Sequence, residues 1–521
     1  MNSNFKLKSL DEAVALIPND ATVAVMGFIT CGVPEYLLRG VERSFLDTGA
    51  PHDLGLVYTA GIGDRKGGGA GRFAHEGLVR RVIAGHYAMA PALQALICAN
   101  KVQAYNLPQG TLCEIIRDSA GGRPGTVSKI GLGTFVDPRN EGGRMNAATT
   151  EDIVEVVSLL GEDWLFYHRI PIDVALIKAS YADELGNLSC QNEAAVSSIT
   201  SMAQAAHNNG GLVIAQVNEV VAAHSLDPRL VKVPGFMVDA IVVVPSEEQM
   251  MTAVDRFRPA YCGETRVPLQ SITRIPLDQR KIIARRAYLE LGDKGGVLNL
   301  GIGIPEGVAI VAVEEGTVDQ LFLTVESGIN GGVPESGLRF GAAWNPDMII
   351  DESSQFDFYD GGGLDATFIG LAQMDQDGNV NVSRFGPTIP GCGGAINITQ
   401  TAKRVAFCGT FTAQGLQVEV VDGQLSIVRE GTARKLIDRV EQVTFSGTYA
   451  KETGQSALYI TERAVFEMRP EGLTLTEIAP GIDLERDIIA HMGFTPRIAD
   501  DLRTMDPRIF RDQPMTSPVN A

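Results

Sequence analysis

Short apolar runs alternate with stretches of helical periodicity along the first half of the chain. The runs of strand length are "TVAVMGF" (22–28), "DLGLVY", "ALICAN", "DVALIKA", "LVIAQVN" and "AIVVVP". Ser9 and Glu12 have the spacing of a capping box, which predicts that an amphipathic helix opens there and ends near Pro18. Alternation of strands and helices is typical of a parallel sheet covered by helices.

The second half of the chain begins a new series of elements after a polar stretch that contains prolines. We interpret residues 246–280 as a linker between an N-terminal domain, 1–245, and a C-terminal domain, 281–521. The C-terminal domain is predicted to open with a helix over 281–292, followed by the strands "GVLNL" (296–300) and "LFLTV" (321–325).

The two halves share a short pattern that suggests an early duplication. "VAVMGFITCGVPEYLL" (23–38) and "VLNLGIGIPEGVAIV" (297–311) each contain a strand, a turn with glycine, and a Pro-Glu pair that opens a helix. Pro34 and Pro305 suit the first helical position, where an amide hydrogen is not needed. Two similar α/β domains explain the pattern, and chance similarity of a short match is the alternative.

Charge and cysteine content narrow the class of protein. The 521 residues carry 44 basic and 63 acidic side chains, a net charge of −19, which argues against a general nucleic-acid or anionic-membrane surface. The seven cysteines form no CxxC pair, so neither a disulfide framework nor a zinc site is expected. No apolar N-terminal leader and no apolar run of membrane-spanning length is visible, and we expect a cytoplasmic protein.

Glu326 is the most conspicuous candidate for chemistry. It stands at the end of the run "LFLTV" and immediately before the glycine-rich "SGINGGVPESG". The turn "LGIGIPEGVA" (300–309) lies one strand earlier, so a nicotinamide dinucleotide site is one interpretation. Against it, Pro305 removes an amide from the turn, and the glycine spacing is one residue too long. A lone surface acid is the ordinary alternative for Glu326.

Other motifs have ordinary structural explanations. The glycine turn "PGCGGAINI" (390–398) could supply backbone donors for an oxyanion or a phosphate, or could be a tight loop that needs positive φ. "DQDGNVNV" (375–382) begins like a calcium loop but lacks later ligands, so a hairpin turn is predicted. His75 is expected to cap or pack, and neither Cys31 nor Cys392 has a neighbouring base.

Several ordered motifs together resemble family I coenzyme A transferases, over about residues 5–510. The catalytic-half motifs are "ESGINGGVPESGLRFGAAWNP", "QFDFYDGGGLDATFIGLAQMDQDGNVNVS", "GCGGAINI" and "VAFCGTF". The N-terminal motifs are "GFITCGVPEYLL", "AHEGLVRRVIAGH", "YNLPQG" and "GTFVDPR". The sequence is most similar to bacterial acetate and propionate CoA-transferases in which both halves are fused. The resemblance implies two similar, open, mainly parallel-sheet α/β domains that face a shared cleft.

The resemblance also implies roles for particular residues. Glu326 would be the nucleophile, the side-chain amide of Gln109 would bind the oxyanion, and the backbone amide of Gly394 would be a second donor. The glycines expected along coenzyme A are Gly32, Gly301, Gly303, Gly391 and Gly393. Glycines beside Glu326 would let the pantetheine arm approach the backbone. Arg384, Lys403 and Arg404 are candidates for holding the phosphates, with solvated surface positions as the alternative.

The function implied is that of a short-chain acyl-CoA:carboxylate CoA-transferase of the acetate and propionate type. It would work by ping-pong through an acyl-glutamyl anhydride and a glutamyl-CoA thioester on Glu326. No metal and no permanently bound cofactor is expected, because the coenzyme A thioester is itself the substrate. The expected partners are small acyl-CoA and carboxylate molecules, and a homodimer or homotetramer is expected. The alternatives are an acyl-CoA hydrolase and a non-catalytic CoA-binding regulator on the same fold.

Overall fold

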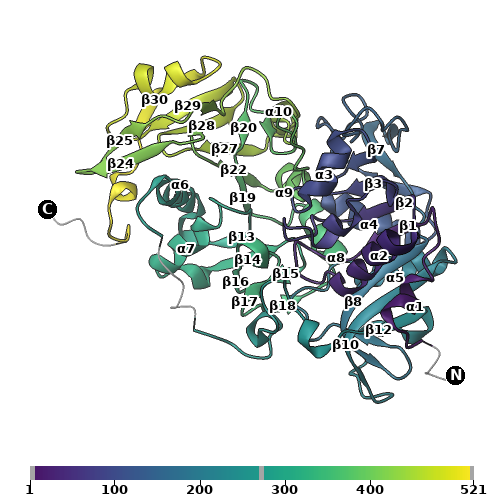
Figure 1. Cartoon of the computed structure of the whole chain (residues 1–521). Coiled ribbons are helices and arrows are strands. Elements are labelled where there is room, and N and C mark those ends of the chain that lie inside the picture. The colour runs from purple at the N-terminus through teal and green to yellow at the C-terminus, as the bar shows by residue number, and fades with distance from the viewer. Residues whose placement is uncertain (1–5, 269–274, 517–521) are drawn as a thin grey trace. The chain divides into compact units, whose positions relative to one another are not determined.

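The computed structural model describes residues 6–268 and 275–516 (Figure 1). The chain divides into two compact units. Unit 1 comprises Met1–Arg266, Val325–Phe358 and Phe385–Asn397. Unit 2 comprises Val267–Thr324, Tyr359–Arg384 and Ile398–Ala521. Unit 1 therefore includes two segments from beyond the expected linker. The domain boundaries at 245 and 281 and the cleft between domains stay predictions, and residues 269–274 of the linker lie outside the described residues.

Unit 1 is built on a parallel sheet with the strand order β12-β10-β8-β1-β2-β3-β4. The strands are β1 (Thr22–Val25), β2 (Leu54–Tyr58), β3 (Val79–Ala84), β4 (Gln103–Asn106), β8 (Val174–Asp183), β10 (Leu212–Val221) and β12 (Ala240–Val243). The helices are α1 (Leu10–Val14), α2 (Glu35–Thr48), α3 (Pro91–Cys98), α4 (Gln109–Ala120) and α5 (Ile199–Asn208). Most strand residues are buried, as expected for a sheet covered on both faces.

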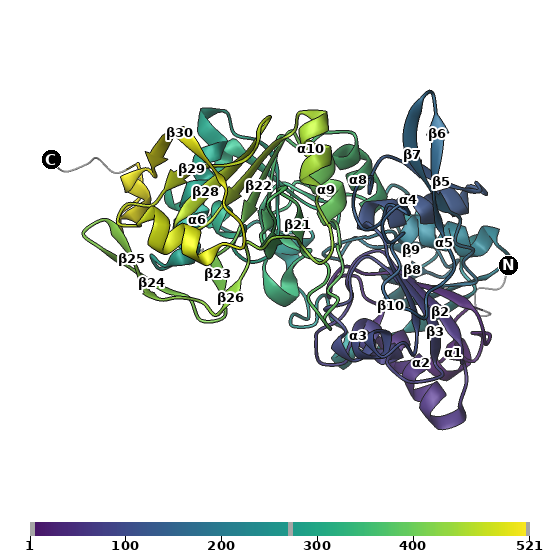
Figure 2. The same cartoon turned by 90° about the horizontal axis from the view of Figure 1, so that it is seen from above.

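Smaller strands complete unit 1. β9 (Leu188–Ser189) pairs antiparallel with β8 and with β11 (Val231–Val233). β5 (Gly125–Ser128), β6 (Val154–Leu159) and β7 (Glu162–His168) form a separate antiparallel sheet (Figure 2). The segment 325–358 adds the pairs β15 (Ile329–Asn330) with β18 (Met348–Ile349) and β16 (Val333–Pro334) with β17 (Ala343–Trp344), and then α8 (Glu352–Asp360).

Unit 2 contains a sheet whose strand order is β14-β13-β19-β22-β27-β28-β29-β30. The strands are β13 (Gly296–Leu300), β14 (Leu321–Val325), β19 (Ala366–Gly370), β22 (Arg404–Cys408), β27 (Ser456–Ile460), β28 (Ala464–Arg469), β29 (Gly472–Ile478) and β30 (Arg497–Thr504). β14 to β27 run parallel, and β28 is antiparallel to its neighbours. The main helices are α6 (Gln279–Tyr288), α7 (Gly307–Glu314), α9 (Ala395–Thr401) and α10 (Gly447–Thr453).

Most helices and strands predicted from the sequence are present in the structure. Mainly parallel α/β sheets are confirmed, as is the capping box of Ser9 and Glu12. "ALICAN" (95–100) was wrong as a strand, because its first four residues form the end of α3, which opens at Pro91, and only Ile97 of the run is buried. The helices after the shared pattern begin at Glu35 and Gly307, one and two residues after the two prolines. In both places the next strand returns parallel beside the first, β2 beside β1 and β14 beside β13.

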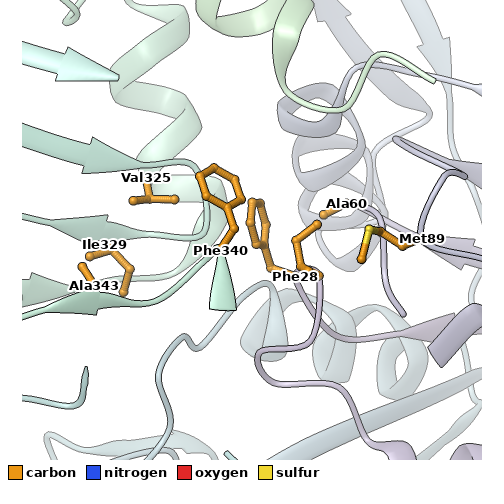
Figure 3. Close-up of a cluster of buried hydrophobic side chains, with 8 residues drawn as sticks. Phe28, Ala60, Met89, Val325, Ile329, Phe340 and Ala343 are labelled. Carbon is orange, nitrogen blue, oxygen red and sulfur yellow. The ribbon is translucent and has the colours of Figure 1, made fainter. Parts of the chain in front are cut away.

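A hydrophobic cluster packs the segment 325–358 against the N-terminal part of unit 1. Phe28 faces Phe340 with ring centroids 5.6 Å apart, and both rings are buried (Figure 3). Val325, Ile329 and Ala343 come from the second segment, while Ile29, Ala60 and Met89 come from the first. The cluster includes Val325, so its packing holds the backbone at the residue before Glu326.

Candidate active site

Glu326 lies at the carboxyl end of β14, where the chain enters unit 1. Its exposed fraction is 8%, so the lone surface acid considered from sequence is wrong. The next residue, Ser327, is fully buried and donates from Oγ to the Gly341 carbonyl at 2.9 Å. A buried strand end with its neighbour fixed in this way gives the carboxylate a defined position.

The glycines after Glu326 have an intramolecular explanation. Gly328 has φ +98°, and a Cβ there would overlap the carbonyl oxygen of Ile350. Gly331 and Gly332 also have positive φ, and a Cβ at Gly332 would overlap the Trp344 carbonyl oxygen. The close approach at these turns is made by the protein's own backbone.

Gln109 is placed by the turn from β4 into α4. It is the first residue of α4, it is 2% exposed, and its backbone N–H donates to the Gly393 carbonyl at 2.9 Å. The helix N-terminus carries a partial positive charge, which favours a developing anion beside it. The expected position of Gln109 at a strand-to-helix turn therefore suits an oxyanion-binding role.

Gly394 lies between the two side chains that the sequence singled out. A Cβ at Gly394 would stand 3.6 Å from Glu326 Cγ, 3.6 Å from Gln109 Oε1 and 3.4 Å from the Phe356 ring. These residues therefore gather around one Cα within unit 1. The Gly394 N–H makes no hydrogen bond to another residue of the described chain, and it precedes the first residue of α9.

The loop that carries Gly394 is fixed to the sheet by Asn106, a residue the sequence did not single out. Asn106 is fully buried and ends β4. Its Nδ2 donates to the carbonyls of Ala84 and Gly85, while its Oδ1 accepts from the Cys392 N–H at 2.8 Å. The Gly393 N–H adds a bond to the Gly85 carbonyl at 2.7 Å. Asn106 thus ties the carboxyl end of β3 to the glycine loop.

Glu352 is a second buried carboxylate at this site, and no sequence signal pointed to it. It is fully buried in the first turn of α8 and accepts from Gln109 Nε2 at 2.5 Å. Thr59 and Ser198 each donate a hydroxyl to it at 3.0 Å. Burial raises the pKa of Glu352 to about 7, and the hydrogen bonds from Gln109, Ser198 and Thr59 oppose that rise. The sequence around Glu352 indicates only an acidic residue in the first turn of a helix.

The remaining glycines expected along coenzyme A lie in different surroundings. Gly391 is packed against Asn106 and His86, whereas Gly393 has open space where a Cβ would be. Gly32 is buried beside Met26 and the Ala195 carbonyl.

Gly301 and Gly303 belong to unit 2. Both follow β13 at its carboxyl end; the Gly301 N–H donates to the Phe368 carbonyl at 2.8 Å, and Gly303 has φ +93° with open space at its Cβ position. Parallel sheets generally bind ligands at this edge.

Two of the three basic residues suggested from sequence for the phosphates, Lys403 and Arg404, do not lie at that edge. Lys403 precedes β22 and pairs with Asp365 at 2.7 Å, and Arg404 is the first residue of β22 and donates to the Glu290 carbonyl at 2.7 Å. Because β13, β19 and β22 are parallel, these two residues lie at the opposite edge of the sheet from Gly301. Arg384 follows β21 (Val380–Asn381), where its backbone N–H donates to Asn381 Oδ1 at 3.1 Å.

The other candidate groups have structural roles. His75 Nε2 lies 2.9 Å from Glu42 Oε1, and its ring packs near Phe45. Cys31 and Cys392 are buried, and burial raises the pKa of both thiols, that of Cys31 to about 12. That shift disfavours the thiolate needed for nucleophilic chemistry.

The "DQDGNVNV" segment forms a hairpin turn between β20 (Gln373–Met374) and β21, as predicted. The Gly378 N–H closes the turn on the Asp375 carbonyl at 3.0 Å.

Within residues 6–268 and 275–516, no group of three or more His, Cys, Asp or Glu side chains is arranged to hold a metal ion. Over the same ranges, no helix has both the length and the apolar character that crossing a bilayer requires.

Comparison with known proteins identifies the family. The family model for "Coenzyme A transferase" matches residues 7–244. A caffeate CoA-transferase of Acetobacterium woodii is 44% identical over 98% of both chains, and the acetate CoA-transferase YdiF of Escherichia coli K12 is 42% identical over 99% of this chain and 97% of its own. The acyl-CoA transferase YdiF of E. coli O157:H7, solved as a thioester complex with CoA, superposes with a TM-score of 0.93 at 41% identity, over 99% of this chain and 98% of that one.

The chain therefore belongs to family I of the coenzyme A transferases, and it is an enzyme of that class with both halves fused in one polypeptide. The resemblance inferred from the sequence motifs is confirmed. The nicotinamide interpretation of the turn at Gly301 is not supported by these relatives.

Proposed function

We propose that this enzyme transfers coenzyme A between short-chain carboxylic acids of the acetate and propionate type, with Glu326 as the nucleophile. The observation that carries the proposal is the gathering of Glu326, Gln109 and Gly394 around one Cα position in unit 1. A carboxylate nucleophile lets the acyl group leave as a free acid while the thioester bond is kept on the enzyme.

The proposed reaction has four steps that balance. The Glu326 carboxylate attacks the thioester carbonyl, forms an acyl-glutamyl anhydride and releases CoA thiolate. The thiolate attacks the glutamyl carbonyl, forms a glutamyl-CoA thioester and releases the first acid. The acceptor carboxylate then attacks that thioester to give a new anhydride and thiolate. Attack of the thiolate on the new acyl carbonyl releases the product thioester and restores Glu326.

Gln109 and Gly394 are proposed to stabilise the negative oxygen of the tetrahedral intermediates. The Gly394 N–H has no acceptor among the described residues, and Gln109 Nε2 donates one hydrogen to Glu352 Oε1, which leaves its second hydrogen for the oxyanion. Donors preorganised in this way avoid reorganisation at the moment of reaction. The 8% exposure of Glu326 supports a dry site, which limits hydrolysis of the anhydride and of the thioester.

Small acids are proposed because the site is closely packed. The Phe356 ring stands against Gly394, and a Cβ at Gly110 would overlap the same ring. One relative is named for acetate and another for caffeate, so the family accommodates different acyl sizes, and acetate or propionate is the choice for this chain. The proposed reaction needs no metal and no permanently bound cofactor.

We also propose a homodimer or homotetramer that works in the cytoplasm. The seven cysteines are all free, which fits a reducing compartment. Light scattering after size-exclusion chromatography tests the oligomer, and a monomer at micromolar concentration would contradict it.

Isotope exchange tests the proposed transferase reaction against hydrolysis. Acetyl-CoA incubated with labelled acetate is expected to acquire the label without net loss of thioester, and Glu326→Gln is expected to abolish the exchange. Initial rates against both substrates should give the parallel lines of a ping-pong mechanism. Loss of thioester at a rate independent of acetate would favour the hydrolase instead. Binding of CoA without exchange or hydrolysis would favour the regulator.

A further inference from the structure

A buried lysine lies at the carboxyl edge of the sheet in unit 2, and the catalytic scheme does not use it. Lys435 follows β26 (Ala433–Arg434), and its exposed fraction is 8%. Its backbone carbonyl accepts from the Met374 N–H at 2.8 Å. A Cβ at Gly409 would lie 2.8 Å from Lys435 Nζ, so the glycine leaves room for the ammonium.

The position of Lys435 relates it to the ends of parallel strands. Gly409 directly follows β22, and the Leu371 carbonyl, which also lies close to Gly409, directly follows β19. The Gly301 turn follows β13, the neighbour of β19. In this sheet the chain runs from β13 to its neighbour β14 on one side. It then continues with β19 on the other side of β13, followed outward by β22 and β27. The order therefore reverses between β13 and β19, and such a reversal is where open α/β sheets bind ligands.

Lys435 lacks a direct hydrogen-bonding partner for its charge within the described residues. Its ammonium makes no hydrogen bond and no ion pair with any residue of the described ranges. Glu462 attracts it through space, but one oxygen of Glu462 accepts from the Phe411 N–H at 2.8 Å and the other from Arg463 Nε at 2.7 Å. Burial outweighs this attraction and lowers the pKa of Lys435 to about 8. A mostly buried ammonium that makes no direct hydrogen bond is a favourable place for an anion that approaches from solvent.

We propose that Lys435 is a coenzyme A phosphate-binding residue, with the glycine turn at Gly301 lying along the same edge. Coenzyme A is the substrate of the family to which the chain belongs, and its phosphates are anions that a lysine suits as a point charge. This inference rests on the use of coenzyme A by the proposed transferase. It gives the strongly acidic protein a local cation for an anionic substrate, which the residues Lys403 and Arg404 do not supply.

The test compares a full thioester with one that lacks phosphates. Lys435→Met keeps the length of the side chain and removes the charge. We expect its KM for acetyl-CoA to rise about 10- to 100-fold, as for loss of one charged hydrogen bond, while KM for acetyl-pantetheine stays unchanged. Lys403→Met removes an exposed lysine from the opposite edge and is expected to leave both values unchanged.

Thermal unfolding of the same variants separates a binding role from a structural one. Removal of a buried unpaired charge is expected to leave the melting temperature of the free enzyme unchanged or raised, while the upward shift produced by free CoA shrinks. An unchanged KM for acetyl-CoA, an equal loss with acetyl-pantetheine, or a lowered melting temperature with a normal CoA shift would each overturn the proposal. The proposed transferase function survives those results, because label exchange by the wild-type enzyme is measured separately.

Discussion

Individual side chains at the site come from opposite halves of the chain, and each is fixed by a different kind of contact. Glu326 is held by the turn that follows it, Gln109 by the start of α4 and by Glu352, and Gly394 by the loop that Asn106 secures. Catalysis by oxyanion donors depends on such fixing, because the donors must already point at the place where charge develops.

Gln109→Ala tests the oxyanion role at the residue scale. Loss of one preorganised donor is expected to lower kcat about 100- to 1000-fold with a much smaller change in KM. Steady-state rates with acetyl-CoA and propionate, with circular dichroism to check folding, make the measurement. A raised KM with an unchanged kcat would assign Gln109 to ground-state binding instead.

The pKa of Glu352 gives an expected pH dependence. Its carboxylate accepts from Gln109, and burial raises its pKa to about 7. As the pH falls below that value, Glu352 takes up a proton, becomes a weaker acceptor and holds Gln109 less firmly, so kcat should fall. Glu352→Gln stays neutral at every pH, and its kcat is expected to be lowered but flat between pH 6 and 8, about one unit to either side of that pKa. The same acid limb in both proteins would exclude Glu352 as its source.

Sequence reasoning reached some of these residues and missed others for physical reasons. Glu326, Gln109 and Gly394 were recognised because each lies in a short motif that resembles a motif of the family. Glu352 and Asn106 were missed because their roles arise only when distant segments pack together: Glu352 meets Thr59 and Ser198 in space, and Asn106 meets Cys392.

At the scale of elements, the turn after β14 needs backbone conformations that favour glycine. Gly328 and Gly337 lie in the same segment of unit 1 and both have positive φ, +98° and +61°. They differ in surroundings: a Cβ at Gly328 would overlap the Ile350 carbonyl, whereas Gly337 has open space. Substitution at Gly337 therefore measures backbone strain alone, whereas substitution at Gly328 measures strain together with steric overlap.

Gly328→Ala is expected to destabilise the protein by about 3 kcal/mol or more, or to prevent folding, because overlap adds to strain. Gly337→Ala is the matched control and should cost about 1 kcal/mol, the strain of a left-handed conformation alone. Denaturant unfolding followed by tryptophan fluorescence measures both. Equal losses would show that the Ile350 carbonyl can move aside.

The periodicity of the sequence predicted buried parallel strands well and failed where helices are equally apolar. "ALICAN" has the composition of a short strand, but it completes a helix whose start is marked by Pro91. The short pairs β15 with β18 and β16 with β17 had no signal, since strands of two residues show no alternation.

At the scale of the whole molecule, the compact units do not follow the halves of the sequence. Unit 1 takes Val325–Phe358 and Phe385–Asn397 from the second half, and Phe340 buries its ring against Phe28. Chain order alone could not show this exchange, because it depends on packing between segments far apart in sequence.

Division of the chain after Arg266 tests that arrangement. Residues 1–266 alone are expected to lack cooperative unfolding and to bind a hydrophobic dye, because Phe28, Ile29 and Met89 lose their partners from 325–358. Co-expression with 267–521 is expected to restore a cooperative transition and activity. A stable, cooperatively folded 1–266 fragment would show that the second segment is dispensable for unit 1.

The covalent role of Glu326 is the central claim, and peptide mapping after incubation tests it most directly. The enzyme is mixed with acetyl-CoA in the absence of any acceptor acid, and the modified residue is located by mass spectrometry, with borohydride reduction to confirm a thioester. The account predicts a CoA thioester at Glu326 that is absent from Glu326→Gln, although that variant still binds CoA. Label exchange that proceeds at full rate with no adduct, or with an adduct on another residue, would contradict it.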